Sequence, residues 1–267
     1  MINYVVYSHT DYLDVLKIQT DYVLPIKNNT LLINTNNLDL SEIYSKYDNI
    51  IFYNDNNPYP QRVSEGLRNI DDEFILFIHD IDILFYVDDD LISQLHSFLK
   101  FNNYDRIDLK HSGNVNTSTI YECSNMYDYN TWNKHNNVKD NNNLFLIKQD
   151  DPSQYIYNVN PSIWKRESLI EIMDKFPTKN YRTIEDFDVQ IFCKKYSIYK
   201  IFSKEKKECG HFDCIKNFIF FHISHNGKFV PLNGYSTIYG QSYIEYSNKY
   251  EEIINKYNLK KSNKWIQ

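Results

Sequence analysis

Short apolar runs and segments of helical periodicity alternate along the first hundred residues. The apolar runs occupy residues 4–7, 31–33, 50–53 and 74–78, and the last of them contains no polar residue. An unbroken apolar run of this length is typical of a strand that is buried on both faces of a parallel sheet. We therefore expect four strands here, with residues 74–78 central in the sheet.

Helix signals separate these four runs. Thr10 is a candidate cap for a first helix, Ser41 begins a second, and Pro60 opens a third, because proline is accepted in a first helical turn. Apolar residues of the third helix recur at i, i+4 and i+7 from Val63 onward. The alternation predicts an α/β fold, built as a single Rossmann-like, doubly wound and mostly parallel sheet flanked by helices.

The second half of the chain is less regular. Residues 102–151 are polar and rich in asparagine, and they predict long loops with a short strand or two, the last at residues 144–147. A turn is expected at Pro161. The other elements expected here are strands at residues 155–159 and 218–223 and helices at residues 168–175 and 186–196.

The C-terminal segment carries a stripe of aromatic and aliphatic residues at helical spacing. A packing face is the favoured interpretation of this stripe, and a partner-binding face is the alternative. No internal repeat and no linker divides the sequence, so one domain is expected over residues 1–267. The stripe consists of Tyr243, Tyr246, Tyr250, Ile253 and Tyr257.

The composition limits the classes of function. The chain has 267 residues and a formal charge of −6, so a protein that coats nucleic acid or an anionic membrane is not expected. No apolar stretch reaches the ~20 residues of a membrane span, and the N-terminus lacks the pattern of a signal peptide, so a cytoplasmic protein is expected. A bias toward Asn, Ile, Lys and Tyr is typical of an AT-rich genome, such as that of a large DNA virus or a parasite.

The glycines and cysteines exclude further classes. Only 6 glycines are present, none spaced as Gly-x-Gly, so the sequence lacks the loops that cradle phosphate in dinucleotide-binding, P-loop and kinase folds. A phosphate group would have to be held by a metal ion and side chains. The irregular spacing of the four cysteines indicates reduced thiols. A zinc site at Cys209, His211 and Cys214 is the less favoured alternative to ordinary packing.

Two carboxylates follow the central apolar run. Asp80 and Asp82 are two residues apart, so in an extended chain their side chains point to the same side. They are expected at the carboxyl end of a central strand, where open α/β sheets bind ligands. Two buried neighbouring carboxylates raise each other's pKa, and a divalent cation removes that cost. We interpret the pair as a site for Mn²⁺ or Mg²⁺, with a turn on the surface as the alternative.

A second acidic cluster, residues 88–90, directly precedes the apolar residues Leu91, Ile92 and Leu95. Three acidic residues ahead of an apolar helical pattern are typical of a helix N-terminus. We expect helix capping here rather than metal binding.

Four segments resemble the nucleotide-sugar-dependent glycosyltransferases of the GT-A fold. Residues 73–85, Glu-Phe-Ile-Leu-Phe-Ile-His-Asp-Ile-Asp-Ile-Leu-Phe, resemble their DxD segment, and residues 60–69 lie where these enzymes carry a helix of the donor site. Residues 181–188, Tyr-Arg-Thr-Ile-Glu-Asp-Phe-Asp, resemble the Glu-Asp motif of inverting β-1,4-galactosyltransferase-like enzymes. Residues 221–227, Phe-His-Ile-Ser-His-Asn-Gly, resemble the late histidine segment that returns to the metal. The segments follow the order of the family, over residues 1–230.

The resemblance implies a GT-A-like fold with two functional halves. Residues 1–100 would bind the nucleotide sugar and the metal, residues 101–240 would bind the acceptor, and residues 241–267 would form a C-terminal helix. Tyr-Arg-Thr-Ile stands where the galactosyltransferase group has tryptophan and glycine before Glu-Asp, so neither the donor sugar nor the acceptor is implied. The implied partners are a nucleotide-sugar donor, with UDP as the expected nucleotide, and a glycan or glycoprotein acceptor. A homodimer is left open.

The implied metal ligands are Asp80, Asp82 and a histidine of the late segment. His222 and His225 are three residues apart, so in a strand they lie on opposite faces, and each is a candidate. Gly227 indicates that the strand ends near His225, which favours His225.

The candidate nucleotide-binding residues are Asp80, Arg62, Thr10 and Asp55. Arg62 lies near the N-terminus of the third predicted helix, where it could meet the diphosphate. A surface ion pair with Glu65 is equally compatible with its position.

The Glu-Asp motif supplies the candidate catalytic residues. Asp186 is predicted as the general base that takes the proton from the acceptor hydroxyl, and Glu185 as the residue that orients the acceptor. One base opposite the leaving group implies inversion at the anomeric carbon. Thr183 and Asp186 also match a capping box for the following helix. Trp164 is a candidate sugar-stacking residue on the acceptor side, and a place in the core is its favoured use.

Two other classes of function share these features. A metal-dependent phosphoesterase or nucleotidyltransferase would use the same carboxylates and histidines without transferring a sugar, and its products would differ. A non-catalytic carbohydrate-binding protein would account for the 24 tyrosines and 16 phenylalanines, and its affinity would survive chelation.

Overall fold

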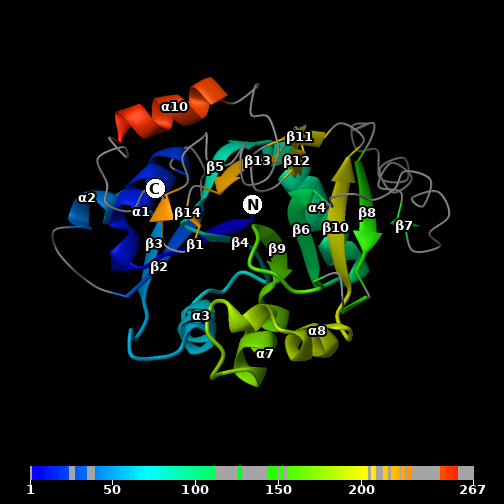
Figure 1. Ribbon diagram of the computed structural model, residues 1–267. Helices are drawn as coiled ribbons and strands as arrows, with labels where there is room; N and C mark the ends of the chain where they lie inside the picture. Colours follow the sequence, from blue (N-terminus) through cyan, green and yellow to red (C-terminus); the bar gives the residue numbers. More distant parts are fainter. Residues whose placement is uncertain are drawn as a thin grey trace.

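The predicted α/β fold is present in the computed structural model, where the described residues form a main sheet of nine strands with helices on both faces (Figure 1). None of the helices in the described part of the chain is long and apolar enough to cross a membrane. The structure describes residues 2–23, 28–34, 40–111, 126–127, 144–149, 151–152, 155–203, 206–208, 213–215, 218–222, 224–225, 228–229 and 247–257.

The main sheet has the strand order β3-β2-β1-β4-β9-β6-β10-β8-β7. Neighbouring strands are parallel from β3 to β4 and between β6 and β10, whereas β9 and β8 are antiparallel to their neighbours. All of the described strands of this sheet except β9 and β8 therefore run in the same direction, so the sheet is mostly parallel, as expected. Its strands are β1 (Asn3–Tyr7), β2 (Asn29–Ile33), β3 (Asn49–Phe52), β4 (Phe74–His79), β6 (Arg106–His111), β7 (Met126–Tyr127), β8 (Leu144–Lys148), β9 (Ser162–Lys165) and β10 (Ile198–Ser203).

Strand β4 lies between β1 and β9 and is buried along its whole length, which confirms the predicted central position of residues 74–78. Alternate residues of β4 face the two layers of helices. Leu76 and Ile78 belong to a core with residues of α1, α2 and α4, whereas Ile75 and Phe77 belong to a core with residues of α3, α7 and α8. Helices on both faces make the sheet doubly wound.

The helices of the first face are α1 (Leu13–Val23), α2 (Ser41–Tyr44) and α4 (Asp89–Asn102), and a short 3₁₀ turn η1 (Thr10–Tyr12) precedes α1. Those of the second face are α3 (Tyr59–Leu67), α7 (Arg166–Lys175) and α8 (Phe187–Cys193), which lie together in Figure 1. The acidic cluster caps α4 as predicted, because the Asp88 side chain accepts a hydrogen bond from the Leu91 N–H at 3.1 Å.

A smaller sheet with the order β11-β12-β13-β5 covers part of the first face. The C-terminal helix α10 packs through Ile253 and Ile254 against Val15, Ile18 and Ile83 of α1 and β5. Ile253 therefore confirms the packing interpretation of the C-terminal stripe, whereas Tyr243 and Tyr246 lie outside the described residues. The bounds are β5 (Asp82–Val87), β11 (Lys206–Glu208), β12 (Asp213–Ile215), β13 (Phe218–His222), β14 (Ser224–His225), β15 (Lys228–Phe229) and α10 (Ser247–Lys256).

Several expected elements were wrong. The residue that caps the first helical segment is His9, not Thr10, and its ring accepts a hydrogen bond from the Asp11 N–H at 3.1 Å. Residues 155–159 are not a strand; Tyr155 has a positive φ of 53°, which a continuous strand does not accommodate. Helix α8 is shorter than the helix expected at residues 186–196. Strands β5, β6, β9 and β10 were not predicted.

Candidate active site

The strand order creates a topological switch point between β1 and β4. From β1 the chain continues to β2 and β3 on one side, and β4 lies on the other side of β1. Ligands of open α/β sheets bind outside the carboxyl ends of the strands at such a point. The Asp80 N–H donates to the Tyr7 carbonyl at 3.0 Å, and Ser8 Oγ donates to Asp80 Oδ2 at 2.6 Å. These two bonds fix Asp80 at the switch point.

Both carboxylates of the pair are buried, with exposed fractions of 5% for Asp80 and 2% for Asp82. Burial raises the pKa of Asp80 to about 7. The charge of Asp82 adds to the rise, whereas hydrogen bonds from Ser8 and from the backbone of His9 and Ile81 oppose it. Asp80 belongs to a tight turn, and Asp82 is the first residue of β5. The turn is therefore real, but its carboxylates do not lie on the surface.

The metal site predicted at this pair has no third ligand among the described side chains. Across the described ranges, no group of three or more His, Cys, Asp or Glu residues is arranged to hold a metal ion. In the register of β5 and β13, Asp82 pairs with His222. His225 lies in β14, which pairs with β15 in a separate sheet. The side chains of both histidines lie outside the described part of the structure.

Two of the predicted nucleotide-binding residues, Thr10 and Asp55, lie together at the carboxyl ends of β1 and β3. Asn34, which follows β2, joins them: its Nδ2 donates to Thr10 Oγ1 at 3.1 Å and to Asp55 Oδ2 at 3.2 Å. Asn34 Oδ1 also accepts from the Thr10 N–H at 3.1 Å. His9 Nε2 lies 3.0 Å from Asp55 Oδ1. Asn34 and His9 were not identified from the sequence, where only their position after a strand could have indicated them.

Arg62 joins the same group from helix α3. Its Nη2 lies 3.0 Å from Asp55 Oδ1, and its Nε donates to the Asn57 carbonyl at 2.6 Å. The guanidinium also lies over the ring of Tyr53, 5.6 Å from the ring centre. Glu65 instead accepts hydrogen bonds from Asn57. The alternative of an Arg62–Glu65 surface pair is therefore wrong, because Asp55 is the partner of Arg62.

Aromatic side chains surround the base of the site. Tyr59 Oη lies 2.9 Å from His79 Nε2, and the ring of Tyr181 lies 5.1 Å from that of His79. Burial raises the pKa of Tyr181 well above its usual value, and the charges of Asp82, Glu185 and Asp80 add to the rise. Tyr181 thus interacts electrostatically with both the carboxylate pair and Glu185.

Glu185 ends the 3₁₀ turn η4 (Thr183–Glu185) and faces inward. Its Oε1 accepts a hydrogen bond from the Val159 N–H at 2.8 Å. Burial raises the pKa of Glu185, while that hydrogen bond and the charges of Arg106 and Lys110 oppose the rise. A partly buried carboxylate with a raised pKa is suited to accept a proton near neutral pH.

Asp186 has a different environment. Its side chain is 50% exposed, and its Oδ2 lies 2.8 Å from Lys179 Nζ. Asp186 stands at the N-cap position of α8 but makes no capping hydrogen bond with its side chain, and Thr183 Oγ1 accepts from the Asn180 N–H. The predicted capping box is therefore wrong. The catalytic role of Asp186 stays a prediction.

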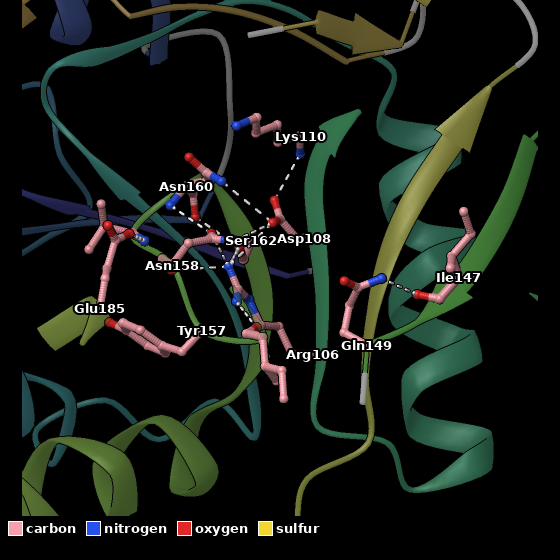
Figure 2. Close-up of polar contacts among 12 residues, drawn as sticks. Arg106, Asp108, Lys110, Ile147, Gln149, Tyr157, Asn158, Asn160, Ser162 and Glu185 are labelled. Carbon is pink, nitrogen blue, oxygen red and sulfur yellow. Dashed lines mark hydrogen bonds and ion pairs between the residues drawn. The ribbon is translucent and has the colours of Figure 1, made fainter. Parts of the chain in front are cut away.

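A buried polar cluster beside Glu185 was missed by sequence reasoning (Figure 2). Arg106 and Asp108 on β6 are both fully buried, with 3.8 Å between Arg106 Nη2 and Asp108 Oδ2. Asp108 Oδ2 accepts from Asn158 Nδ2 at 2.7 Å, and Oδ1 accepts from the Lys110 N–H at 3.0 Å. Charged residues at alternate positions of a strand normally indicate a solvent-facing side, so nothing in the sequence marks these two as buried.

The remaining predicted residues have structural uses or lie outside the described residues. Trp164 is 2% exposed and lies in β9, with the Arg106 guanidinium 4.7 Å from its ring, so it belongs to the core, as favoured. Cys209, His211 and the side chain of Cys214, the candidate zinc ligands, lie outside the described part of the chain.

The chain is similar to several solved structures. No family model and no curated protein sequence matches the chain. It is similar to a cytidylyltransferase from Leptospira borgpetersenii serovar Hardjo-bovis (TM-score 0.48, 10% identity, 100% of this chain and 98% of that chain). It is also similar to apo UDP-glucose pyrophosphorylase (0.47, 12%, 94% and 99%) and to S. aureus TarS (0.43, 14%, 79% and 60%). Such a likeness concerns the fold alone, and the chemistry of this chain rests on its own residues.

Proposed function

We propose that this protein is a metal-dependent glycosyltransferase that transfers a sugar from a nucleotide diphosphate sugar, with UDP as the expected nucleotide, to an acceptor hydroxyl. The observation that carries the proposal is the buried pair Asp80 and Asp82 at the carboxyl end of β4, beside the switch point with β1. A ligand with a diphosphate and a metal ion would meet the sheet there. A single base on the acceptor side implies inversion at the anomeric carbon, and we include inversion in the proposal.

The donor set of the pair fits a divalent cation. Ionising Asp80 beside Asp82 is costly in the protein alone, as the pKa of about 7 indicates, and a cation offsets that cost. Mg²⁺ or Mn²⁺ takes one or two carboxylates together with water and substrate phosphate oxygens, so two protein carboxylates suffice. When bound, the ion would stabilise the charge that grows on the leaving diphosphate. We propose His222 or His225 as a third ligand, and the pairing of His222 with Asp82 favours His222.

The group formed by Thr10, Asn34, Asp55 and Arg62 is proposed to hold the nucleotide. It occupies the carboxyl ends of β1, β2 and β3, on the side of the switch point away from β9. Hydroxyl, amide and carboxylate groups suit the polar edges of a base and a ribose. Arg62 places its guanidinium at this edge of the sheet, where it would bind the diphosphate.

Glu185 is the favoured general base. Its Oε1 is held by the Val159 N–H, so Oε2 would meet the acceptor hydroxyl. The raised pKa of Glu185 makes the carboxylate a stronger base than an exposed glutamate. Asp186 is the alternative, but its carboxylate is half exposed and paired with Lys179. The kinetics of Glu185→Gln and Asp186→Asn would show which of the two residues is the base.

Thermal shift with a panel of nucleotide diphosphates and nucleotide sugars tests the proposal at the level of binding. We expect one nucleotide diphosphate to raise the melting temperature in the presence of Mn²⁺ and to lose this effect with EDTA, because its phosphates and the Asp pair share the metal. A shift of the same size with and without EDTA would contradict a metal-dependent donor site. No shift with any nucleotide would contradict the proposed substrate class.

A further inference from the structure

The segment that carries Val159, residues 155–160, contains neither helix nor strand, yet residues 156–158 are buried. Buried N–H and C=O groups outside regular structure need side-chain partners. Gln190 supplies two of them: its Oε1 accepts from the Tyr157 N–H at 2.7 Å, and its Nε2 donates to the Tyr157 carbonyl at 2.9 Å. The conformation of the segment is therefore set by side chains around it.

Arg106 binds two further backbone groups of the segment. Its Nη1 donates to the Ile156 carbonyl at 2.9 Å, and its Nη2 lies 3.1 Å from the Asn158 carbonyl and 2.6 Å from Asn158 Oδ1. Nη2 also lies 2.7 Å from Ser162 Oγ. Figure 2 shows the guanidinium directed toward Asn158 and Ser162. Only a planar fork of several N–H groups can reach this set of acceptors from one position.

Stability alone does not require an arginine at this place. A buried ion pays a desolvation cost that its partners only partly repay, and apolar residues of similar volume often serve as well or better. Arg106 is fully buried, and its nearest carboxylate oxygen, on Asp108, is 3.8 Å away. The guanidinium instead binds backbone carbonyls, which indicates that its use is to hold a backbone conformation.

The backbone groups of Val159 connect this segment to both parts of the site. The Val159 N–H donates to Glu185 Oε1 at 2.8 Å, and the Val159 carbonyl lies 3.0 Å from His79 Nδ1. His79 directly precedes Asp80. A displacement of residues 156–160 would therefore move Glu185 relative to the carboxylate pair.

We propose that Arg106 is a positioning residue: its buried guanidinium fixes residues 156–160, and through Val159 this segment orients the Glu185 carboxylate toward the site of the Asp80–Asp82 pair. The structural part stands on the hydrogen bonds alone. The catalytic consequence rests on the proposed function, in which Glu185 is the base.

Amide hydrogen exchange of Val159 tests the structural part without any assay of activity. In Arg106→Lys, a single ammonium group cannot bind both the Ile156 and the Asn158 acceptors, so we expect exchange at Val159 to accelerate at least ~10-fold, with no change at Val5 or Leu76 in the sheet. Unchanged Val159 exchange in the folded variant would overturn the proposal. A uniform acceleration over the whole sheet would also overturn it, because that result indicates loss of global stability.

Arg166→Lys is the matched control. Arg166 follows the last residue of β9, whereas Ser162, which contacts Arg106, is the first residue of that strand. Among the described residues, the Nε atoms of Arg166 and Arg106 are both buried and have no hydrogen-bond partner. We expect no change of Val159 exchange in this variant. If Arg106→Lys does not fold, Ser162→Ala removes one acceptor of Arg106 together with the hydrogen bond from Ser162 Oγ to the Asn160 carbonyl, and it should still accelerate Val159 exchange at least ~3-fold. No acceleration in Ser162→Ala would then overturn the proposal.

A double-mutant cycle tests the catalytic part once transfer is detected. We expect Arg106→Lys to lower kcat at least ~10-fold while KM for the donor changes less than ~3-fold, and the double variant with Glu185→Gln to be no slower than Glu185→Gln alone. If the kcat losses of the two single variants multiply in the double variant, the result would contradict positioning through Glu185. If the wild-type chain transfers no sugar, the proposed function fails, and the exchange of Val159 still decides the structural part.

Discussion

Ser8 Oγ donates a 2.6 Å hydrogen bond to Oδ2 of Asp80, joining the residue after β1 to the residue after β4. The bond crosses the place where the order of the strands changes direction. Such a place is where open α/β sheets receive their ligands. A buried carboxylate next to a second buried carboxylate is costly to ionise without a cation, and the hydrogen bond from Ser8 offsets only part of that cost. The predictions about pH and metal depend on this fact.

The first prediction concerns the stability of the metal-free protein. Asp80 has a pKa of about 7 in the folded chain and an ordinary, lower value when unfolded. Between these values the folded state keeps a proton that the unfolded state has lost, so the contribution of Asp80 to stability falls as the pH rises toward 7 and stays low above it. Asp80→Asn should therefore raise Tm by roughly 3 °C or more at pH 8, and by much less near pH 4.

Thermal melts in EDTA at both pH values measure this effect. Asp71→Asn, at an exposed aspartate before β4, is the control and should show no such difference between the two pH values. An equal gain of Asp80→Asn at both pH values would mean that Asp80 does not carry a raised pKa.

The second prediction concerns the affinity for metal. Because the cation competes with a proton on Asp80, the affinity for Mn²⁺ in the presence of the nucleotide diphosphate should rise about tenfold between pH 6 and pH 8. Asp82→Ala should weaken metal-dependent binding at least ~10-fold. Calorimetry checks both results, and nucleotide affinity that is equal in Mn²⁺ and in EDTA would contradict the assignment of the metal site.

The third prediction concerns the proposed histidine ligand, and the pair of variants His222→Ala and His225→Ala tests it. Since His222 pairs with Asp82 in the register of β5 and β13, we expect only the first variant to weaken Mn²⁺-dependent binding, by ~10-fold or more. Calorimetry with the same nucleotide measures both variants. A loss confined to His225→Ala would assign the ligand to β14 instead.

The fourth prediction compares the two residues of the Glu-Asp motif. Glu185→Gln keeps an oxygen that can accept from the Val159 N–H but cannot take a proton, so kcat should fall at least ~10²-fold while donor binding is kept. Asp186→Asn should keep more than about a tenth of the wild-type kcat, because Asp186 is half exposed and bound to Lys179. Steady-state kinetics of the two folded variants would show the opposite order if Asp186 is the base.

The extent to which the sequence predicts this fold depends on where polar residues lie. Strands β1 to β4 were predicted because their apolar runs are bounded by polar residues, as for residues 74–78. Strand β6 was missed because it buries two charged residues. Arg106 binds backbone carbonyls of residues 156–158, and Asp108 accepts a hydrogen bond from the Asn158 side chain. Residues 155–159 have the composition of a strand, but Arg106 and Gln190 bind their backbone groups, so a tertiary contact replaces the sheet.

The candidate site likewise contains residues that the sequence identifies and residues that only the fold brings together. Asp80 and Asp82 are recognisable from sequence because they follow an apolar strand directly. Ser8 and Asn34 are common polar residues after strands, and only the strand order shows that they meet Asp80 and Asp55. The predicted capping box at Asp186 failed because Lys179, seven residues earlier, binds the carboxylate.

The central claim is that the bond broken in the donor is the one between the anomeric carbon and the diphosphate. ³¹P NMR of the protein with Mn²⁺, the nucleotide sugar selected by thermal shift and a panel of hydroxyl acceptors identifies that bond directly. The account predicts that the nucleoside diphosphate accumulates with both phosphates intact, only with metal and acceptor present, and that Asp82→Ala abolishes it. Formation of a nucleoside monophosphate, or of a sugar phosphate and a nucleoside triphosphate when pyrophosphate is supplied, would show that the phosphate bridge is cleaved and would contradict sugar transfer.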